Sequence, residues 1–156
     1  MLSLFGCSGT SSNPSEGVFV KWDTEGMYDG PSGPNGVGVA SDGSVYVTDI
    51  GDDRIQKFTS EGVFISQWGT GGSGDGEFRS PLGVAVASDG SVYVADTSNS
   101  RIQKFTSEGV FVSNWGTEGT VGGQFDRPRG VAVATNGSLY VADSHNHRIQ
   151  KFSLRP

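Results

Sequence analysis

The stretch VYVADTSNSRIQKFTSEGVFVSNWG, residues 92–116, repeats most of an earlier stretch, VYVTDIGDDRIQKFTSEGVFISQWG, residues 45–69. It begins a third time as LYVADSHNHRIQKF, residues 139–152. Gly36, Gly83 and Gly130 open the same phrase, so the repeat is 47 residues long, and residues 36–82 are identical to 83–129 at 31 of 47 positions. Such a period is typical of solenoids and propellers, whose units bury their apolar faces against neighbouring units.

Each repeat predicts four antiparallel strands, which in the first copy lie near residues 37–40, 45–49, 54–58 and 63–68. The first two strands are joined by Ser41-Asp42-Gly43, a turn whose Asp-Gly pair supplies the positive φ angles of a tight hairpin. No window shows the apolar spacing of an amphipathic helix. Four antiparallel strands form one propeller blade. The predicted fold is therefore all-β, with three blades per chain.

The distribution of polar and apolar residues fits packed blades. The second strand is apolar on both faces, as in Val92, Tyr93 and Val94, which is expected when neighbouring blades cover both sides. The third and fourth strands contain polar residues, which outer strands can expose; these are Gln103, Lys104, Ser113 and Asn114. Large aromatic residues recur in the fourth strands and are expected to pack between blades; they are Phe19, Trp22, Phe64, Trp68, Phe111 and Trp115.

Composition excludes several classes of protein. The chain has 156 residues and a formal net charge of −6, which argues against a general affinity for nucleic acid or anionic membranes. No run approaches the roughly 18 apolar residues of a membrane span. A single cysteine, Cys7, excludes an internal disulfide framework and a cluster of metal-binding thiolates.

The order of the predicted strands is permuted. The segment GVFVKW, which begins at Gly17, matches the fourth strand of the repeat, whereas the third repeat ends after its third strand. Residues 17–154 therefore predict three blades in which the N-terminal strand, Val18–Trp22, pairs beside the third strand of the last blade, Arg148–Phe152. This pairing would cover an open sheet edge.

Three blades leave too large an angle to close a propeller, which typically has four to eight. Two explanations stay open at this point. Two chains could form a homodimer with a six-bladed ring, in which each N-terminal strand completes the last blade of its partner. Alternatively, the chain is a piece of a longer propeller.

Residues 1–16 precede the predicted blades and read as a disordered tether. The segment LFGC, which ends at Cys7, is similar to a bacterial lipobox, in which the cysteine is lipidated. A signal normally places 7–15 apolar residues behind a basic start, and this one does not. It is either a truncated lipoprotein signal or a chance match. A true lipobox would predict an extracytoplasmic or cell-envelope location.

Three stretches resemble NHL repeats: FRSPLGVAVASDGSVYVADTSNSRIQKF, residues 78–105; FDRPRGVAVATNGSLYVADSHNHRIQKF, residues 125–152; and the first copy, which begins at Gly36. The resemblance extends over residues 17–154. The first copy departs from it, because MYDGPSGPNG lacks the Phe, Gly38 replaces Ala, and GDDR replaces SNSR. The resemblance implies a β-propeller, commonly with six blades, that binds partners through the loops of one face.

The loops after each second strand and the Gly-rich loops before each first strand are expected on that face. Rigid scaffolds often carry their sites on such loops. The candidate ligand-binding residues are Asp52, Asp53, Asn99, His145, Asn146, His147, Arg79, Arg127 and Arg129. In contrast, Asp49, Asp96 and Asp143 each precede an arginine by five residues, once per repeat, which predicts a scaffold role, either an ion pair or loop hydrogen bonds.

No catalytic set can be assembled from this sequence. His145 and His147 could ligate a metal, but they stand in one loop without a third ligand, so we predict no cofactor and treat them only as weak metal candidates; a dimer would bring a second such pair across the ring. The carboxylates of Asp52 and Asp53 have no second acidic cluster to work with. The loop GTGGSGDGEF, residues 69–78, lacks the Gly-Lys-Ser/Thr ending of a phosphate-binding loop and reads as a flexible connector.

Three functions are compatible with these features. The favoured one is a non-catalytic scaffold whose loops bind a protein, peptide or glycan, because the strands agree between repeats while the loops differ. A metal-dependent enzyme similar to the peptide-amidating lyase would need several channel histidines, which are absent here. RNA binding, which is known for some NHL proteins, is disfavoured by the net charge, although Arg79, Arg127 and Arg129 keep it open.

Overall fold

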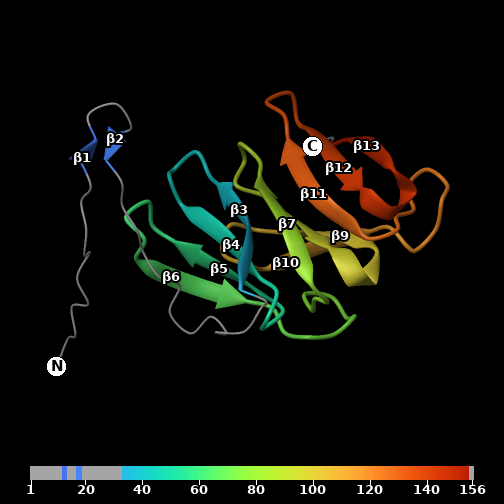
Figure 1. Ribbon diagram of the computed structural model, residues 1–156, viewed down its shortest axis with the longest axis horizontal. Helices are drawn as coiled ribbons and strands as arrows, with labels where there is room; N and C mark the ends of the chain where they lie inside the picture. Colours follow the sequence, from blue (N-terminus) through green and yellow to red (C-terminus); the bar gives the residue numbers. More distant parts are fainter. Residues whose placement is uncertain (1–11, 14–16, 19–32, 155–156) are drawn as a thin grey trace.

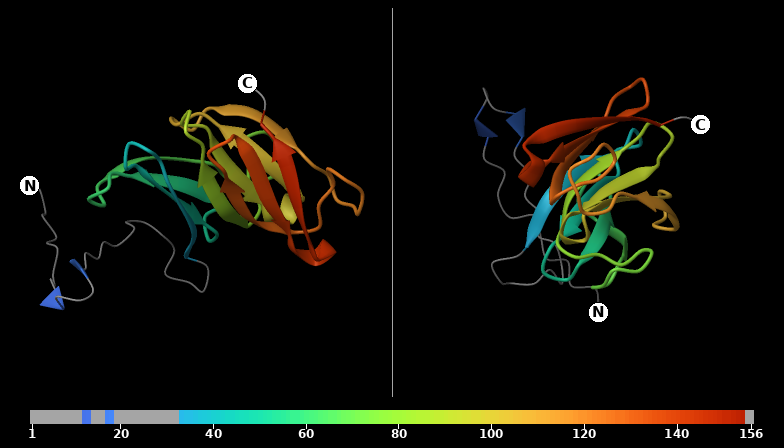
Figure 2. Two further views of the ribbon diagram at one scale, coloured as in Figure 1. Left: turned by 90° about the horizontal axis from the view of Figure 1, so that it is seen from above. Right: turned by 90° about the vertical axis from the view of Figure 1, so that its right-hand side faces the viewer.

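The computed structural model describes residues 12–13, 17–18 and 33–154, which form an all-β fold (Figure 1). Three antiparallel sheets lie side by side in chain order, and each is one propeller blade (Figure 2). A separate two-stranded hairpin pairs β1 (Ser12–Asn13) with β2 (Gly17–Val18). Among the described residues, no helix is long and apolar enough to cross a membrane.

Each blade runs from an inner to an outer strand. The first blade has the order β3 (Pro34–Val39), β4 (Val45–Asp49), β5 (Arg54–Phe58) and β6 (Phe64–Trp68). The second has β7 (Pro81–Val86), β8 (Val92–Asp96), β9 (Arg101–Phe105) and β10 (Phe111–Trp115). The third has β11 (Pro128–Val133), β12 (Ser138–Asp143) and β13 (Arg148–Ser153).

The predicted repeat of strands is confirmed, with two corrections. The inner strands begin earlier than predicted, at Pro34, Pro81 and Pro128, because a proline can occupy the first position of a strand, where its missing N–H is not needed. A register shift follows each of these prolines. The second correction is a pair of short 3₁₀ turns, η1 (Thr97–Asn99) and η2 (Ser144–Asn146), where no helix is predicted.

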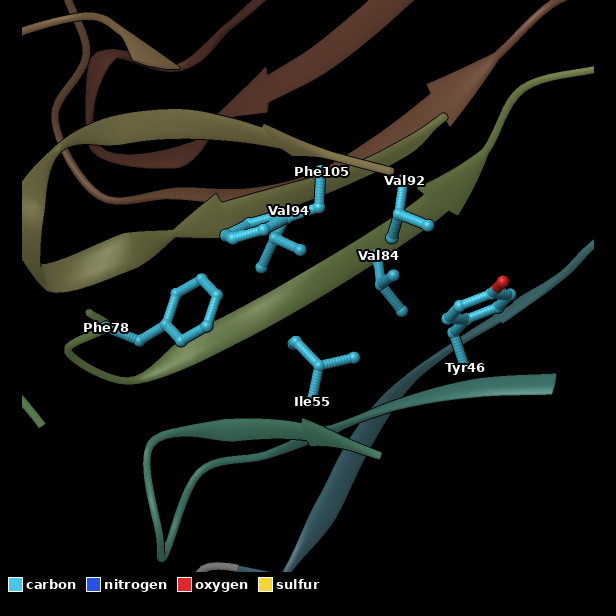
Figure 3. Close-up of a cluster of buried hydrophobic side chains, with 7 residues drawn as sticks. All are labelled: Tyr46, Ile55, Phe78, Val84, Val92, Val94 and Phe105. Carbon is cyan, nitrogen blue, oxygen red and sulfur yellow. The ribbon is translucent and has the colours of Figure 1, made fainter. Parts of the chain in front are cut away.

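The core lies between blades, as the apolar second strands predict. All five residues of β4 and of β8 are buried. Between the first two blades, Tyr46 and Ile55 face Val84, Val94 and other apolar residues of the second blade across one cluster (Figure 3). The equivalent Tyr93 and Ile102 form a second cluster with the third blade. Each blade therefore depends on its neighbour for burial of its apolar face.

The aromatic residues of the outer strands contribute unequally to this packing. Trp68 lies 5.8 Å from the ring of Phe105 in the next blade, and Trp115 lies 5.9 Å from Phe152. These two tryptophans confirm the predicted role between blades. Phe64 remains 47% exposed and meets the ring of Phe58 in its own blade. Phe19 and Trp22 lie outside the described residues.

The predicted N-terminal strand, Val18–Trp22, also lies largely outside the described residues, as does Cys7. Gly17 and Val18 pair with Ser12 and Asn13. Within the described part of the chain, β13 pairs with β12 alone, so its outer edge has no partner strand there. The closure of the last blade by the N-terminal strand stays a prediction.

Candidate binding face

The two sets of loops predicted to share a face do lie together. We define the loop face as residues 50–53, 70–80, 97–100, 117–127 and 144–147. Asn99 donates from Nδ2 to the carbonyl oxygen of Gly72 at 2.9 Å, and Asn146 does the same to Gly119 at 2.8 Å. Each bond joins the loop after a second strand to the Gly-rich loop before the first strand of the same blade.

A buried carboxylate at the end of β8 organises this face in the second blade. The Asp96 side chain is fully buried, and its Oδ2 accepts hydrogen bonds from Asn99 (2.9 Å), Arg101 Nε (2.7 Å) and Gln103 Nε2 (3.0 Å). Its Oδ1 accepts from the backbone N–H of Arg79 at 2.8 Å. One carboxylate thus satisfies four donors, as a buried charge requires.

The guanidinium of Arg101 carries the network into the Gly-rich loop. Its Nη atoms donate to the carbonyl oxygens of Ser73 (2.9 Å), Gly74 (2.7 Å) and Glu77 (2.9 Å). Gln103 donates to the Glu77 carbonyl at 2.6 Å and accepts from the Gly76 N–H at 3.0 Å. The sequence predicts a flexible connector here, but these bonds hold the loop in place.

The third blade repeats the arrangement. The pKa of Asp143 is lowered: burial on its own raises it, but hydrogen bonds from the Asp126 N–H, Asn146, Arg148 and Gln150 outweigh burial. Because the folded-state pKa lies below the unfolded value, this carboxylate stabilises the fold at neutral pH. That contribution is lost as the pH falls through the lowered pKa.

In the first blade, the Gly-rich loop before β3 lies largely outside the described residues, and the structure describes the Asp–Arg part of the network. Arg54 Nε donates to Asp49 at 3.0 Å, and its guanidinium also pairs with Asp52 at 3.0 Å. Aspartate stands at position 52, where the other blades have the asparagines that reach their Gly-rich loops. The predicted Asp–Arg scaffold pairs are therefore confirmed in all three blades.

The candidate ligand residues separate into two groups. Asn99 and Asn146 use their amide groups within the scaffold, and Asp53 accepts the Ser80 N–H at 2.8 Å. The other candidates are exposed, or carry an exposed side chain. Arg129 lies in β11, outside the loop face. The rest lie on that face; they are Asp52, Arg79, Arg127, His145 and His147. Their ligand-binding role stays a prediction.

Left-handed backbone positions explain part of the loop sequence. Asp53, Ser100 and His147 occupy equivalent sites and have φ angles of 50°, 50° and 51°. At Ser100 and His147, this residue ends the 3₁₀ turn by donating its N–H to the carbonyl oxygen of Thr97 or Ser144. The backbone of His147 thus shapes the loop, while its exposed imidazole is available for contact.

Sequence reasoning missed the role of the glutamines. Gln103 is placed by its polarity among outer-strand residues that can be exposed, yet it is fully buried between Asp96 and Glu77. Gln150 bonds in the same way to Asp143 and Gln124. The signal was present, because RIQKF recurs unchanged in all three repeats while the loops around it differ.

The histidines are not assembled with further metal ligands. The Nδ1 of His145 lies 3.5 Å from an Asp126 carboxylate oxygen, and the two side chains are 45% and 40% exposed. Among the residues that the structure describes, no group of three His, Cys, Asp or Glu side chains is placed to hold a metal ion.

We expect zinc or copper to leave the melting temperature unchanged, because two ligands on one loop give too few donors for a tetrahedral site. The measurement is thermal unfolding with and without each metal, using the double variant His145→Ala, His147→Ala as the control. A rise in melting temperature that the double variant abolishes would contradict this expectation.

Comparison with known sequences confirms the resemblance to NHL repeats. The sequence profile described as the NHL repeat matches residues 78–105 and 125–152. Each match runs from the buried phenylalanine of a Gly-rich loop, Phe78 or Phe125, to the end of the third strand. No curated protein matches the chain.

Solved structures share the propeller fold at low sequence identity. Hydrazine synthase from Kuenenia stuttgartiensis matches with a TM-score of 0.62 and 13% identity, over 86% of this chain and 36% of that one. A catalytically inactive virginiamycin B lyase from Staphylococcus aureus, solved with quinupristin, has a TM-score of 0.60 and 16% identity, over 86% of this chain and 45% of that one. A luciferin-regenerating enzyme has a TM-score of 0.52 and 20% identity, over 74% of this chain and 39% of that one. The chain thus spans less than half of these proteins.

Proposed function

We propose that this chain of NHL-type blades is a non-catalytic scaffold, part of a six-bladed propeller, whose loop face binds a protein, peptide or glycan. One observation carries the proposal. The residues that repeat between blades, such as Asp96 and Arg101, are buried in the hydrogen-bond network, whereas exposed positions such as Ser98 and His145 differ between blades. A constant frame that displays varied side chains suits recognition.

The chemistry of the exposed residues favours a partner with both charged and polar groups. Arg79, Arg127 and Arg129 provide cations, and the Asp52 and Asp126 carboxylates, 41% and 40% exposed, provide anions. The three arginines also favour RNA as a second candidate, against the net charge of −6. The metal-dependent enzyme has less support, since the described residues hold no metal-binding group of three.

Selection of binders from a peptide display library and a glycan array tests the scaffold. The variants Arg79→Ala and Arg127→Ala should weaken binding of a selected peptide or glycan about tenfold, the loss typical of a contact worth about 1.4 kcal/mol. Glu108→Ala, at the turn between β9 and β10 on the opposite end of the blade, is the matched control and should leave the affinity unchanged.

Two results would contradict this function. If selected ligands respond only to Glu108→Ala, the binding site is on the other end of the propeller. If a single-stranded RNA oligonucleotide binds with a strong salt dependence that Arg79→Ala and Arg127→Ala reduce, the RNA candidate replaces the scaffold for proteins and glycans.

The proposal also includes attachment to a cell envelope through Cys7, and this part rests on the sequence alone. Mass spectrometry of the protein isolated from membranes of its native host should then detect a diacylglyceryl group on Cys7. An unmodified cysteine would remove the envelope location and leave the loop face unaffected.

A further inference from the structure

The two interfaces inside the chain are built from the same two surfaces. One surface, which we call the donor face, carries Tyr46 and Ile55 in the first blade and Tyr93 and Ile102 in the second. These four side chains are at most 2% exposed. A lysine ammonium lies over each tyrosine ring, Lys57 over Tyr46 and Lys104 over Tyr93, at 5.2 and 5.6 Å from the ring centroid.

The third blade has a donor face with nothing described against it. Tyr140 is 37% exposed and Ile149 is 67% exposed, although their counterparts are buried. Lys151 already lies over the Tyr140 ring, at 5.7 Å, as in the other blades. The face is therefore arranged as in an interface before any partner covers it.

The opposite surface, the acceptor face, is partly exposed on the first blade. Val37 and Val39 are 62% and 61% exposed, whereas Val84, the counterpart of Val37, is 5% exposed in the second blade. Beside Val37 and Val39 on the same face, Val45, Val47 and Phe58 form a small buried cluster. Their counterparts Val92, Val94 and Phe105 receive the donor face of the first blade (Figure 3).

We propose that the donor face of the third blade packs on the acceptor face of the first blade of a second copy of this chain. The proposal rests on the propeller scaffold above, but not on the ligand of its loops. A second copy offers the matching surface by identity, because the same two faces already meet twice within one chain. Two such contacts related by a two-fold axis close a ring of six blades, which lies within the usual range.

The surroundings of Gly130 agree with this contact between copies. A Cβ at Gly36 would collide with the Leu82 carbonyl oxygen, and a Cβ at Gly83 with the Arg129 carbonyl oxygen, because inner strands of neighbouring blades approach closely there. Gly130 is the third equivalent, yet a Cβ there would meet only Ala142 Cβ at 3.4 Å, an ordinary contact. In the ring, Gly130 would face the inner strand of the partner.

The first test is the mass of the full chain by native mass spectrometry and light scattering. We expect twice the 16.3 kDa of one chain. A stable, folded species of 16.3 kDa at micromolar concentration would overturn the proposal, because its apolar faces would then belong to further blades of a longer chain. Open assemblies larger than a dimer would also overturn it, because the contact would not close.

A pair of charge variants tests which faces meet. Figure 3 shows Ile55 directed toward Val84 and Phe78, so the corresponding contact between copies joins Ile149 and Val37. Ile149→Glu and Val37→Lys should each give a folded monomer, because both contacts of the ring are damaged. Mixing the two variants should restore a dimer, which has one unaltered contact and one Glu–Lys contact. Val110→Glu, at a position that is also 61% exposed, is the matched control and should remain dimeric.

Circular dichroism of each variant establishes that a monomeric mass reflects lost contact and not unfolding. A mixture that stays monomeric while both variants are folded would overturn the pairing of these faces. Gly130→Ala should weaken the dimer at least about tenfold, the effect of losing roughly 1.4 kcal/mol of contact, and Gly122→Ala, in open space, should not. Because mass reports assembly and the display screen reports the loops, failure of either proposal is recognised separately.

Discussion

Asp96→Asn is expected to destabilise the protein by about 3–5 kcal/mol, the loss seen when one partner of a buried ion pair is removed. Asparagine has the same shape, so no cavity forms. However, the asparagine amide has only one oxygen, whereas in the native protein the donors converge on the two carboxylate oxygens of Asp96. Either the Arg79 N–H or the group of Asn99, Arg101 and Gln103 must lose its acceptor. The Arg101 side chain, 11% exposed, would be left as an uncompensated charge.

Urea unfolding followed by tryptophan fluorescence measures this loss. Folded proteins are stable by about 5–15 kcal/mol, so the expected change is a large part of the total. Asp52→Asn is the matched control: its carboxylate pairs with Arg54 but is 41% exposed, and it should cost at most about 1 kcal/mol. If both variants unfold at the same urea concentration, the buried network does not hold the blade.

Gly83→Ala is expected to cost at least about 3 kcal/mol, the upper part of the range for overpacked sites. The backbone of Gly83 is not in the left-handed region, so alanine meets no conformational penalty there. The cost comes from the Arg129 carbonyl oxygen and from the Val131 backbone nitrogen, which would lie 3.1 Å from the added Cβ. Both are backbone atoms of β11, so the second and third blades must move apart, and the cluster between them opens.

The melting temperature of Gly83→Ala should fall, while that of Gly122→Ala should not, because nothing lies within 4 Å of a Cβ at Gly122. The two variants make the same chemical change and differ only in what surrounds it. Equal melting temperatures would show that the inner strands can separate without loss, which would be incompatible with the close blade contact in the structure.

The strand pattern could be predicted because it depends on neighbours in sequence. The Asp-Gly turn at Asp42 and Gly43 and the apolar run of Val45, Tyr46 and Val47 specify a hairpin locally. The prediction missed the first residues of the inner strands, which begin at Pro81 and Pro128. The edge of the ladder tolerates a proline only because no N–H is required there.

The candidate site could be predicted only in outline. The face that carries it and its Asp–Arg pairs followed from the repeat. The sequence could not show which polar residues are buried in the hydrogen-bond network and which are exposed to a ligand. Asn99 reads as an exposed loop residue and Gln103 as an outer-strand residue. Both are instead bonded to carbonyl oxygens of the Gly-rich loop, at Gly72 and Glu77. A polar side chain is buried or exposed according to the partners that another segment supplies.

By itself, then, the sequence determined the 47-residue repeat, the all-β class and the four-strand blade, because turn chemistry and alternation act over a few residues. Tertiary structure alone decided three further features: the burial of Asp96 and Gln103, the requirement for glycine at Gly83, and the exposure of Val37 and Ile149 in contrast to their buried counterparts. Asp96 and Gln103 are buried because segments distant in sequence supply their hydrogen-bond partners. Gly83, Val37 and Ile149 differ from their counterparts because packing depends on whether a neighbouring blade is present, and repeats that read alike do not record which of them has a neighbour on each side.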